Sequence, residues 1–243
     1  MIKIEHIHTC NWEAAIRGMR NPLNSWDKSD SGYGCFGKDN GENGKTCLDC
    51  NFNPSWCGCN SEHYILGPND LKLAKQLATA GSDHGKFLRQ IIFSCDITAP
   101  MYWWKEMDTY KVGTVRNSCS TMHKIAAKEF SLDDFSYEHM YNDRDENGAP
   151  DHEEQITENV LKTVISSLNY AREYYIENKR KENWWQMIQL LPSSYNQRST
   201  WTANYEVLRN TYTRKNHKLD EWHVWCDMIE KLPYSELITE ERK

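Results

Sequence analysis

Residues 96–124 bring together side chains that suit a flat heterocycle carrying a phosphate. Between Pro100 and Gly113 lie four aromatic residues, Tyr102, Trp103, Trp104 and Tyr110. Arg116 follows within a run of small hydrogen-bonding residues, Thr114, Asn117, Ser118, Cys119, Ser120 and Thr121. Aromatic faces beside many donors are typical of a pocket for such a ligand. A buried aromatic cluster followed by a polar helix start fits the same residues equally well.

Four cysteines in a Gly- and Asn-rich stretch form a second group with chemical potential. Cys47 and Cys50 make a C-x2-C pair, and Cys57 and Cys59 follow as a C-x-C pair. Thiolates at this spacing can face one ion, and Zn²⁺ binds tetrahedrally to such ligands. A small loop without an apolar core gains order from a metal. The sequence therefore predicts a structural zinc site, with free thiols or a disulfide as alternatives.

Residues 143–154 match the spacing of carboxylates around a glycine in a single calcium-binding loop. Pro150, however, stands where such loops pair through a backbone N–H, and the sequence offers no second loop. A turn at Asn147 and Gly148, followed by an acidic helix start at Asp151, explains the same residues. We favour the turn and keep calcium as the alternative.

The composition is that of a globular protein. Charged residues make up 26% of the 243 residues and hydrophobic residues 39%. No apolar run approaches the roughly 20 residues needed to cross a bilayer, and the N-terminus has no signal-peptide pattern. The formal charge of -6 disfavours general nucleic-acid binding. Nine cysteines without a secretion signal indicate a reducing compartment, so we expect a cytoplasmic protein without a membrane span.

The elements that must position these residues follow an α+β pattern. Strands are expected at 1–8, 87–97 and 199–205. Helices are expected at 11–19, 69–80, 117–130, 151–178, 184–191, 206–214 and 219–232, the clearest being 151–178 with its apolar residues three and four apart. No repeat or long linker is visible, so the sequence predicts one domain over 1–243 with a cysteine-rich insertion at 30–63.

The order of these segments resembles the flavin-dependent thymidylate synthases over most of the chain outside the insertion. Residues 81–84, Gly-Ser-Asp-His, are similar to the family's Gly-His-x-Ser segment before a strand. Residues 110–123 resemble the family's Arg-His-Arg region when Ser120 is placed on its serine. Tyr-Lys-Val at 110–112 then replaces Arg-His-Arg, and Asn117 falls on the family's Asn. Residues 191–222 follow the family's C-terminal half.

The resemblance implies a fold, a reaction and a set of partners. The fold would be an antiparallel sheet with packed helices. The protein would bind FAD and a pyrimidine nucleotide at sites between subunits, as a homo-oligomer, most simply a tetramer. It would transfer a one-carbon unit to C5 of a uracil nucleotide, converting dUMP to dTMP or making a related pyrimidine modification. NADPH and methylenetetrahydrofolate would be co-substrates, and the flavin would carry the hydride and methylene chemistry.

The resemblance also implies residue roles. Ser120 would be the catalytic, substrate-side serine. The nucleotide would be bound by Arg116, Asn117, Ser120 and Lys215. FAD would contact His84, Tyr110, Lys111, Asn204 and Asn210. Met122 and Ile188 stand where the family places nucleotide-binding arginines, and neither side chain offers a planar donor fork. The alternatives are a catalytically divergent nucleotide-binding or assembly protein that retains the fold, and a metal-dependent module built on the cysteines.

Overall fold

The computed structural model describes residues 2–34, 63–140 and 156–242. The strands in these ranges are β1 (Lys3–Cys10), β2 (Gly32–Gly34), β3 (His63–Ile65), β4 (Ile92–Pro100), β5 (Val115–Ser118) and β6 (Asn196–Asn204). The helices are α1 (Trp12–Arg20), α2 (Pro68–Thr79), α3 (Met101–Met107), α4 (Thr121–Lys124), α5 (Ile156–Asn178), α6 (Lys181–Leu190), α7 (Tyr205–Tyr212), α8 (Asp220–Glu230) and α9 (Glu236–Thr239). Short 3-10 turns occupy Asn21–Leu23, Trp26–Lys28, His84–Arg89 and Leu132–Asp134. No helix of the described ranges is long and apolar enough to span a membrane.

An antiparallel sheet with the strand order β1-β4-β6-β5 forms the centre of the molecule. Strands β4 and β6 pair along their whole lengths, from Ile92 opposite Asn204 to Pro100 opposite Asn196. The small strands β2 and β3 pair separately. The predicted α+β class, an antiparallel sheet with packed helices, is confirmed. The cysteines from Cys47 to Cys59 lie outside the described residues.

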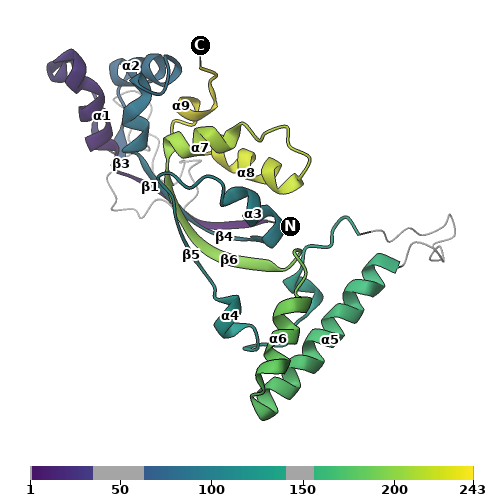
Figure 1. Ribbon diagram of the computed structural model, residues 1–243. Helices are drawn as coiled ribbons and strands as arrows, with labels where there is room; N and C mark the ends of the chain where they lie inside the picture. Colours follow the sequence, from purple (N-terminus) through teal and green to yellow (C-terminus); the bar gives the residue numbers. More distant parts are fainter. Residues whose placement is uncertain (1, 35–62, 141–155, 243) are drawn as a thin grey trace, which may run out of the picture.

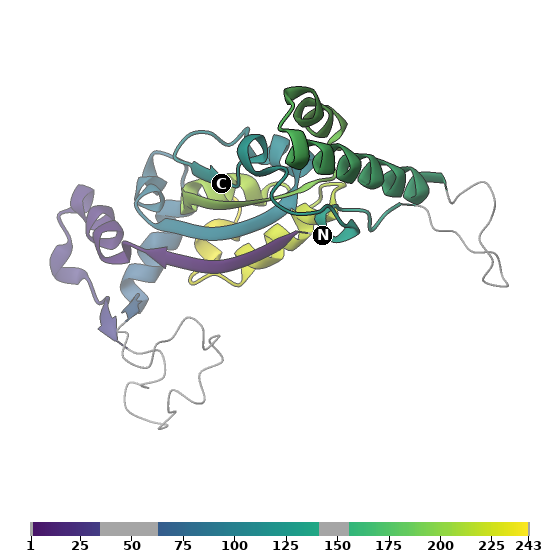
Figure 2. The ribbon, with the colours of Figure 1, turned by 90° about the horizontal axis from the view of Figure 1, so that it is seen from below.

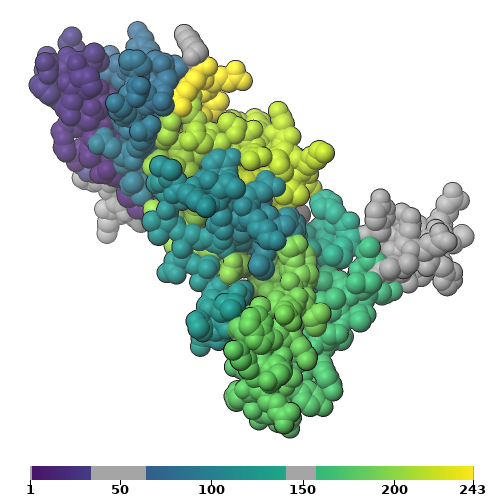
Figure 3. All heavy atoms as spheres, viewed as in Figure 1, coloured from purple at the N-terminus to yellow at the C-terminus, as the bar shows by residue number. Residues whose placement is uncertain are grey.

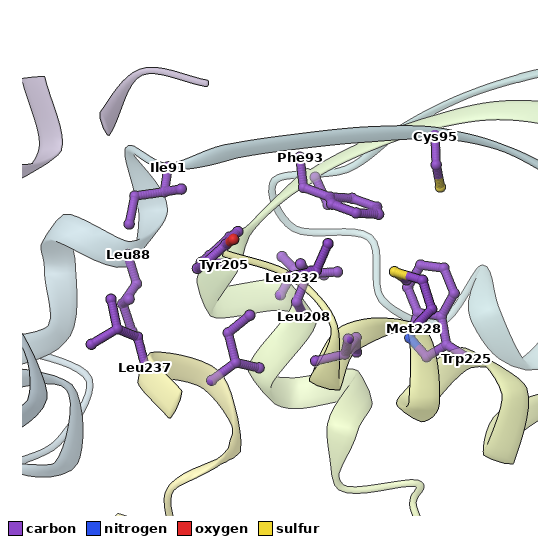
Figure 4. Close-up of a cluster of buried hydrophobic side chains, with 14 of the residues drawn as sticks. Leu88, Ile91, Phe93, Cys95, Tyr205, Leu208, Trp225, Met228, Leu232 and Leu237 are labelled. Carbon is purple, nitrogen blue, oxygen red and sulfur yellow. The ribbon is translucent and has the colours of Figure 1, made fainter. Parts of the chain in front are cut away.

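Alternation along the strands gives the sheet one apolar and one polar face. In β4 the side chains of Phe93, Cys95, Ile97 and Ala99 are buried, while the residues between them are only half-buried. The buried face packs against α3, α7, α8 and α9 (Figures 1 and 2). Figure 4 shows Phe93 and Cys95 pointing from β4 toward Tyr205, Leu208 and Trp225. This pattern is expected of an antiparallel sheet covered by helices on one side.

Helices α5 and α6 form an arm that projects from the main body (Figures 1 and 3). A separate hydrophobic cluster, which includes Leu168, Ala171 and Met187, packs the two helices against residues 125–135. The helix expected at 151–178 is therefore present over Ile156–Asn178. Its apolar residues at spacings of three and four supply this cluster.

The prediction of a helix at 117–130 is wrong. Val115–Ser118 forms strand β5, which pairs with β6 from Val115 opposite Thr202 to Ser118 opposite Ser199. Only the four residues of α4 are helical after it. The pairing partner lies about eighty residues downstream, so tertiary pairing overrides the local pattern of small polar residues.

Helix α2 begins earlier than its expected cap at Asn69. The residue before its first turn is Gly67, which has no capping side chain. The carboxylate of Asp30, which is remote in sequence, caps the helix instead. It accepts hydrogen bonds from the backbone N–H groups of Asn69 (2.9 Å) and Asp70 (3.0 Å). A carboxylate at a helix N-terminus satisfies free N–H groups and complements the helix dipole.

Candidate functional site

A cavity of about 290 Å³ lies between α4 and the adjoining ends of β4 and β6. We call it the α4 cleft; its walls include Ser120, Lys124, Lys128, Tyr195, Asn196 and Arg198. The cleft is on the polar side of the sheet, where Figure 1 shows α4 between the strands and the arm. Its volume is near the lower end of the range for small-ligand pockets.

Ser120 is fixed at the wall of this cleft by α4 and β6. Its Oγ accepts a hydrogen bond from the backbone N–H of His123 (3.1 Å), which caps α4. The preceding residue, Cys119, donates its N–H to the carbonyl of Arg198 (2.9 Å). The carbonyl of Cys119 accepts from Nε2 of Gln197 (2.8 Å). Because Oγ accepts in the cap, the hydroxyl proton of Ser120 remains available for a ligand.

Arg116 lies on β5 and its guanidinium is occupied within the chain. Nε donates to Ser199 Oγ (2.9 Å), Nη1 to Asp108 Oδ2 (2.7 Å) and Nη2 to Gln197 Oε1. The group also lies over the ring of Trp104. The expectation that Arg116 lies at the start of a helix is thus wrong. The residues that line the α4 cleft do not include it. Its neighbour Asn117 is exposed on the strand.

Two of the proposed flavin-binding residues, Tyr110 and Lys111, precede the turn at Gly113, and a third, Asn204, lies against that turn. Gly113 has φ +76°, and a Cβ there would lie 2.8 Å from Nδ2 of Asn204, so the backbone approaches that side chain closely. Asn204 caps α7 by accepting the N–H of Val207 (3.0 Å). Tyr110 accepts a hydrogen bond from Nε of Arg214 (3.1 Å). Lys111 is exposed beside them.

The remaining proposed residues face two other cavities. His84 is exposed on the wall of a cavity of about 540 Å³ that also contacts the end of α1. Asn210 and Lys215 line a third cavity of about 550 Å³ beside the C-terminal segment. Hydrogen bonds to Glu230 and Tyr212 raise the pKa of Lys215, which keeps its ammonium charged. Of the proposed residues, Ser120, His84, and the pair Asn210 and Lys215 therefore border three separate cavities of one chain.

The aromatic residues of 102–110 divide between core and surface. Trp103 and Trp104 are buried with Trp201, Trp222 and Trp225 on the apolar face of the sheet. The buried-cluster interpretation therefore applies to the two tryptophans. Tyr102 and Tyr110 are half-buried. Burial, with a hydrogen bond to Glu221, raises the pKa of Tyr102 to about 12, so its phenol stays neutral.

The sequence analysis missed several residues of the α4 cleft: Lys124, Lys128, Tyr195, Asn196 and Arg198. No spacing in the sequence links 124–128 with 195–198, because β6 brings them together across the fold. Burial raises the pKa of Tyr195, so its hydroxyl remains a neutral donor at the cleft wall.

The residues of the two metal sites considered from the sequence are not among those that the structure describes. Cys47, Cys50, Cys57 and Cys59, and the calcium candidate at 143–154, are outside the described residues. Within the described ranges, no group of three or more His, Cys, Asp or Glu side chains is arranged to hold a metal ion. The thiols described there are all free: Cys10, Cys95, Cys119 and Cys226. Burial raises the pKa of Cys226 to about 11, which leaves it protonated and unreactive.

Comparison with known proteins gives matches in structure. No family model and no curated protein matches the sequence. Two crystal structures of the flavin-dependent thymidylate synthase ThyX of Helicobacter pylori, both with FAD and dUMP, superpose with TM-scores of 0.62 and 0.60. Each is 14% identical; the matches cover 99% and 98% of this chain, and 100% and 98% of theirs.

A third match is the UMP/dUMP methylase PolB of Streptomyces cacaoi bound with 5-Br dUMP. Its TM-score is 0.54 at 14% identity, over 97% of this chain and 93% of the methylase. These likenesses extend over nearly the whole length of each protein. The chain therefore has the fold of the flavin-dependent thymidylate synthases, as the order of its sequence segments predicted.

Proposed function

We propose that this protein binds FAD and a uracil nucleotide and transfers a one-carbon unit to C5 of the uracil ring. The observation that carries the proposal is the fold, shared over 99% of the chain with a synthase crystallised with FAD and dUMP. The position of Ser120 at the wall of a ligand-sized cleft adds to it. NADPH and methylenetetrahydrofolate would supply the electrons and the carbon.

The exposed polar residues fit a flavin shared between subunits. Lys111 offers a cation for a pyrophosphate, and His84 and Asn210 offer donors that are exposed on the described surface. His84 and Asn210 border two separate cavities and Lys111 borders neither of them, so we propose that one flavin meets them on more than one copy. The flavin, when bound, would supply the hydride and one-carbon chemistry, while these side chains bind and orient it.

The nucleotide would lie against Ser120. The hydroxyl proton, not used in the α4 cap, can be donated to a pyrimidine carbonyl oxygen. Asn117 is exposed and available for a further contact, whereas Lys215 would have to exchange its bonds to Glu230 and Tyr212 for one to the nucleotide. A site that hydrogen-bonds a substrate edge discriminates strongly against analogues that lack it.

A nucleotide-binding or assembly protein without turnover is the second candidate. The uncharged side chains of Met122 and Ile188 favour it, because the resemblance places nucleotide-binding arginines at these two positions. Ile188 packs into the hydrophobic cluster of the arm, and Met122 is exposed without a charge. Arg116, which could replace them, is engaged with three protein partners.

Two measurements separate the candidates. Oxidised flavin in the visible spectrum of the purified protein, with formation of dTMP from dUMP in the presence of NADPH and methylenetetrahydrofolate, supports the enzyme. Ser120→Ala should lower the rate by at least about tenfold, while Ser118→Ala, on the exposed end of β5, should not. Bound flavin and nucleotide without product would leave the second candidate. If the protein binds neither flavin nor nucleotide, both candidates are contradicted.

A further inference from the structure

Helix α4 consists of a single turn, Thr121–Lys124, between the sheet and the arm (Figure 1). A helix of this length is not stable by itself, so tertiary contacts must hold it. The backbone N–H of His123 donates to Ser120 Oγ (3.1 Å), and this cap orients the serine side chain only while α4 is formed. The contacts that hold α4 in place therefore also fix the side chain of Ser120.

The arm supplies a hydrogen-bond donor to α4 itself. The indole N–H of Trp184, on α6, donates to the backbone carbonyl of Met122 (3.0 Å). Carbonyl groups in the last turn of a helix have no partner within that helix, and this donor satisfies one of them. Trp184 is half-buried and packs against the hydrophobic cluster of the arm. It therefore joins α4 to α6 through a side chain that the arm itself holds.

Helix α5 binds the segment that follows α4. Nε of Arg172 donates to the carbonyl of Ala126 (3.1 Å). The carboxamide of Asn169 accepts from the N–H of Phe130 (2.8 Å) and donates to the carbonyl of the same residue (2.9 Å). Ile125 and Phe130 are each 5% exposed and belong to the hydrophobic cluster of the arm. By these contacts the segment after α4 is packed as part of the arm.

The residue before Ser120 is held by the sheet instead. The N–H of Cys119 donates to the carbonyl of Arg198 on β6 (2.9 Å), and the carbonyl of Cys119 accepts from Nε2 of Gln197 (2.8 Å). Ser120 thus stands at a junction, with the sheet on one side and the arm on the other. The main body and the arm have separate hydrophobic clusters, so a shift of one relative to the other would be absorbed at this junction.

We infer that the arm positions Ser120 and that Trp184 is the positioning residue. The inference rests on the proposed function, in which Ser120 meets the nucleotide, and extends it to a residue outside the lining of the α4 cleft. Trp184 acts on α4 through the carbonyl of Met122, and α4 acts on Ser120 Oγ through the N–H of His123. Loss of the indole N–H should loosen α4 and leave the serine hydroxyl poorly oriented, which lowers the rate of the reaction.

Trp184→Phe tests this arrangement, because it keeps an aromatic ring at this position and removes the N–H donor. We expect kcat for dTMP formation by the full-length protein to fall by about fivefold, the loss of one hydrogen bond. The decisive measurement is a double-mutant cycle with Ser120→Ala. In the Ser120→Ala background, Trp184→Phe should change the residual kcat by less than about twofold, because the group that it positions is gone. An equal loss of kcat in both backgrounds would show a general effect on the fold and would overturn the inference.

Trp185→Phe is the matched control. Trp185 is the adjacent tryptophan on α6 and is 43% exposed, and among the described residues its indole N–H has no hydrogen-bond acceptor. This substitution should change kcat by less than about twofold. Arg172→Met removes the donor that α5 gives to Ala126, so it should lower kcat only when Ser120 is present. It decides the inference if Trp184→Phe does not fold.

Hydrogen exchange provides a readout that does not depend on activity. The backbone N–H groups of His123, Lys124 and Ile125 donate within α4 and its cap, so their exchange reports whether α4 is formed. Mass spectrometry of the peptide that covers 119–128 should show exchange about fivefold faster in Trp184→Phe than in wild type or Trp185→Phe. Unchanged exchange would overturn the inference even if the protein forms dTMP. Faster exchange supports it even without turnover, in which case the proposed function alone fails.

Discussion

The guanidinium of Arg116 lies over the indole of Trp104, with 3.8 Å between its central carbon and the ring centroid. Trp104 is 2% exposed and donates its indole N–H to the carbonyl of Gln197 (2.9 Å). The same guanidinium donates to Ser199 and Asp108. Arg116 thus closes the edge of the aromatic core where β5 meets β6, and a cation over an indole face is favourable there.

Arg116→Ala should therefore destabilise the protein. Its removal leaves Ser199 and Gln197 without a charged donor and opens the edge of Trp104. We expect the free energy of unfolding to fall by about 2 kcal/mol, in the range for hydrogen bonds to charged groups. Urea unfolding measures it. Arg17→Ala is the control, because the side chains of the ion pair between Arg17 and Glu13 are 64% and 51% exposed. This substitution should lower the free energy of unfolding by less than about 0.5 kcal/mol. Unchanged stability with weaker nucleotide binding would instead give Arg116 the substrate role expected from the sequence.

Much of the fold could be predicted because its elements are encoded locally. The helix of Ile156–Asn178 follows from apolar residues at helical spacing, and β6 from the extended pattern after 199. Strand β5 could not be predicted, since its structure comes from pairing with β6. The cap of α2 likewise comes from Asp30, about forty residues before the helix.

The candidate site was only partly predictable for the same reason. The segment order placed Tyr110, Lys111 and Asn204 in one set, and the Gly113 turn brings them together. The walls of the α4 cleft other than Ser120 were missed, because Lys124 and Asn196 line one cavity only when β6 returns beside α4. Short-range spacing carries no information about such a contact.

The ion pair between Arg20 and Asp70 should make stability depend on pH. The two side chains are 6% and 0% exposed, and Nε lies 2.7 Å from Oδ1. Burial alone raises the pKa of Asp70, but hydrogen bonds from Ser31, Ser29 and Arg20 outweigh it and lower the pKa below its ordinary value. The stabilisation is therefore complete above about pH 4, the ordinary pKa of Asp. It is lost as the pH falls through the lower folded-state value.

Asp70→Asn removes this charge and leaves Arg20 buried without its partner. We expect about 3 kcal/mol less stability at neutral pH, as for a broken buried pair, and a smaller loss on acidification than in wild type. Urea midpoints measured from neutral to acid pH test both. Asp83→Asn is the control, because the Asp83 side chain is 91% exposed and 3.8 Å from Lys86. Parallel pH curves for wild type and Asp70→Asn would contradict the assignment.

The arm should contact a second copy of the chain. Large apolar side chains are exposed along α5 and α6, among them Tyr170 (61%), Tyr174 (42%) and Trp185 (43%). Tyr170 and Tyr174 stand one turn apart, with 4.6 Å between ring centroids. Exposed aromatic groups of this kind are enriched at interfaces. They favour self-association, which the proposed sharing of flavin sites between copies would require; the tetramer stays a prediction.

Light scattering after gel filtration should give a multiple of the 28.6 kDa chain mass. Tyr170→Glu with Tyr174→Glu should shift the protein toward monomer, because two charges would be buried without partners. Glu173→Gln, an exposed change on the same helix, should leave the mass unchanged. A wild-type monomer at micromolar concentration would contradict flavin sites shared between copies.

Cys47, Cys50, Cys57 and Cys59 should together bind about one zinc ion per chain. Strands β2 and β3 pair at the two ends of the segment that carries these cysteines, with Gly34 opposite His63, so the chain leaves and rejoins the described structure at neighbouring positions. Elemental analysis of protein purified without added metal measures the zinc. Cys47→Ser should abolish it, whereas Cys119→Ser, at an exposed thiol outside the insertion, should not. If neither zinc nor iron is found above background, the zinc site is contradicted, and these cysteines are free thiols or form a disulfide.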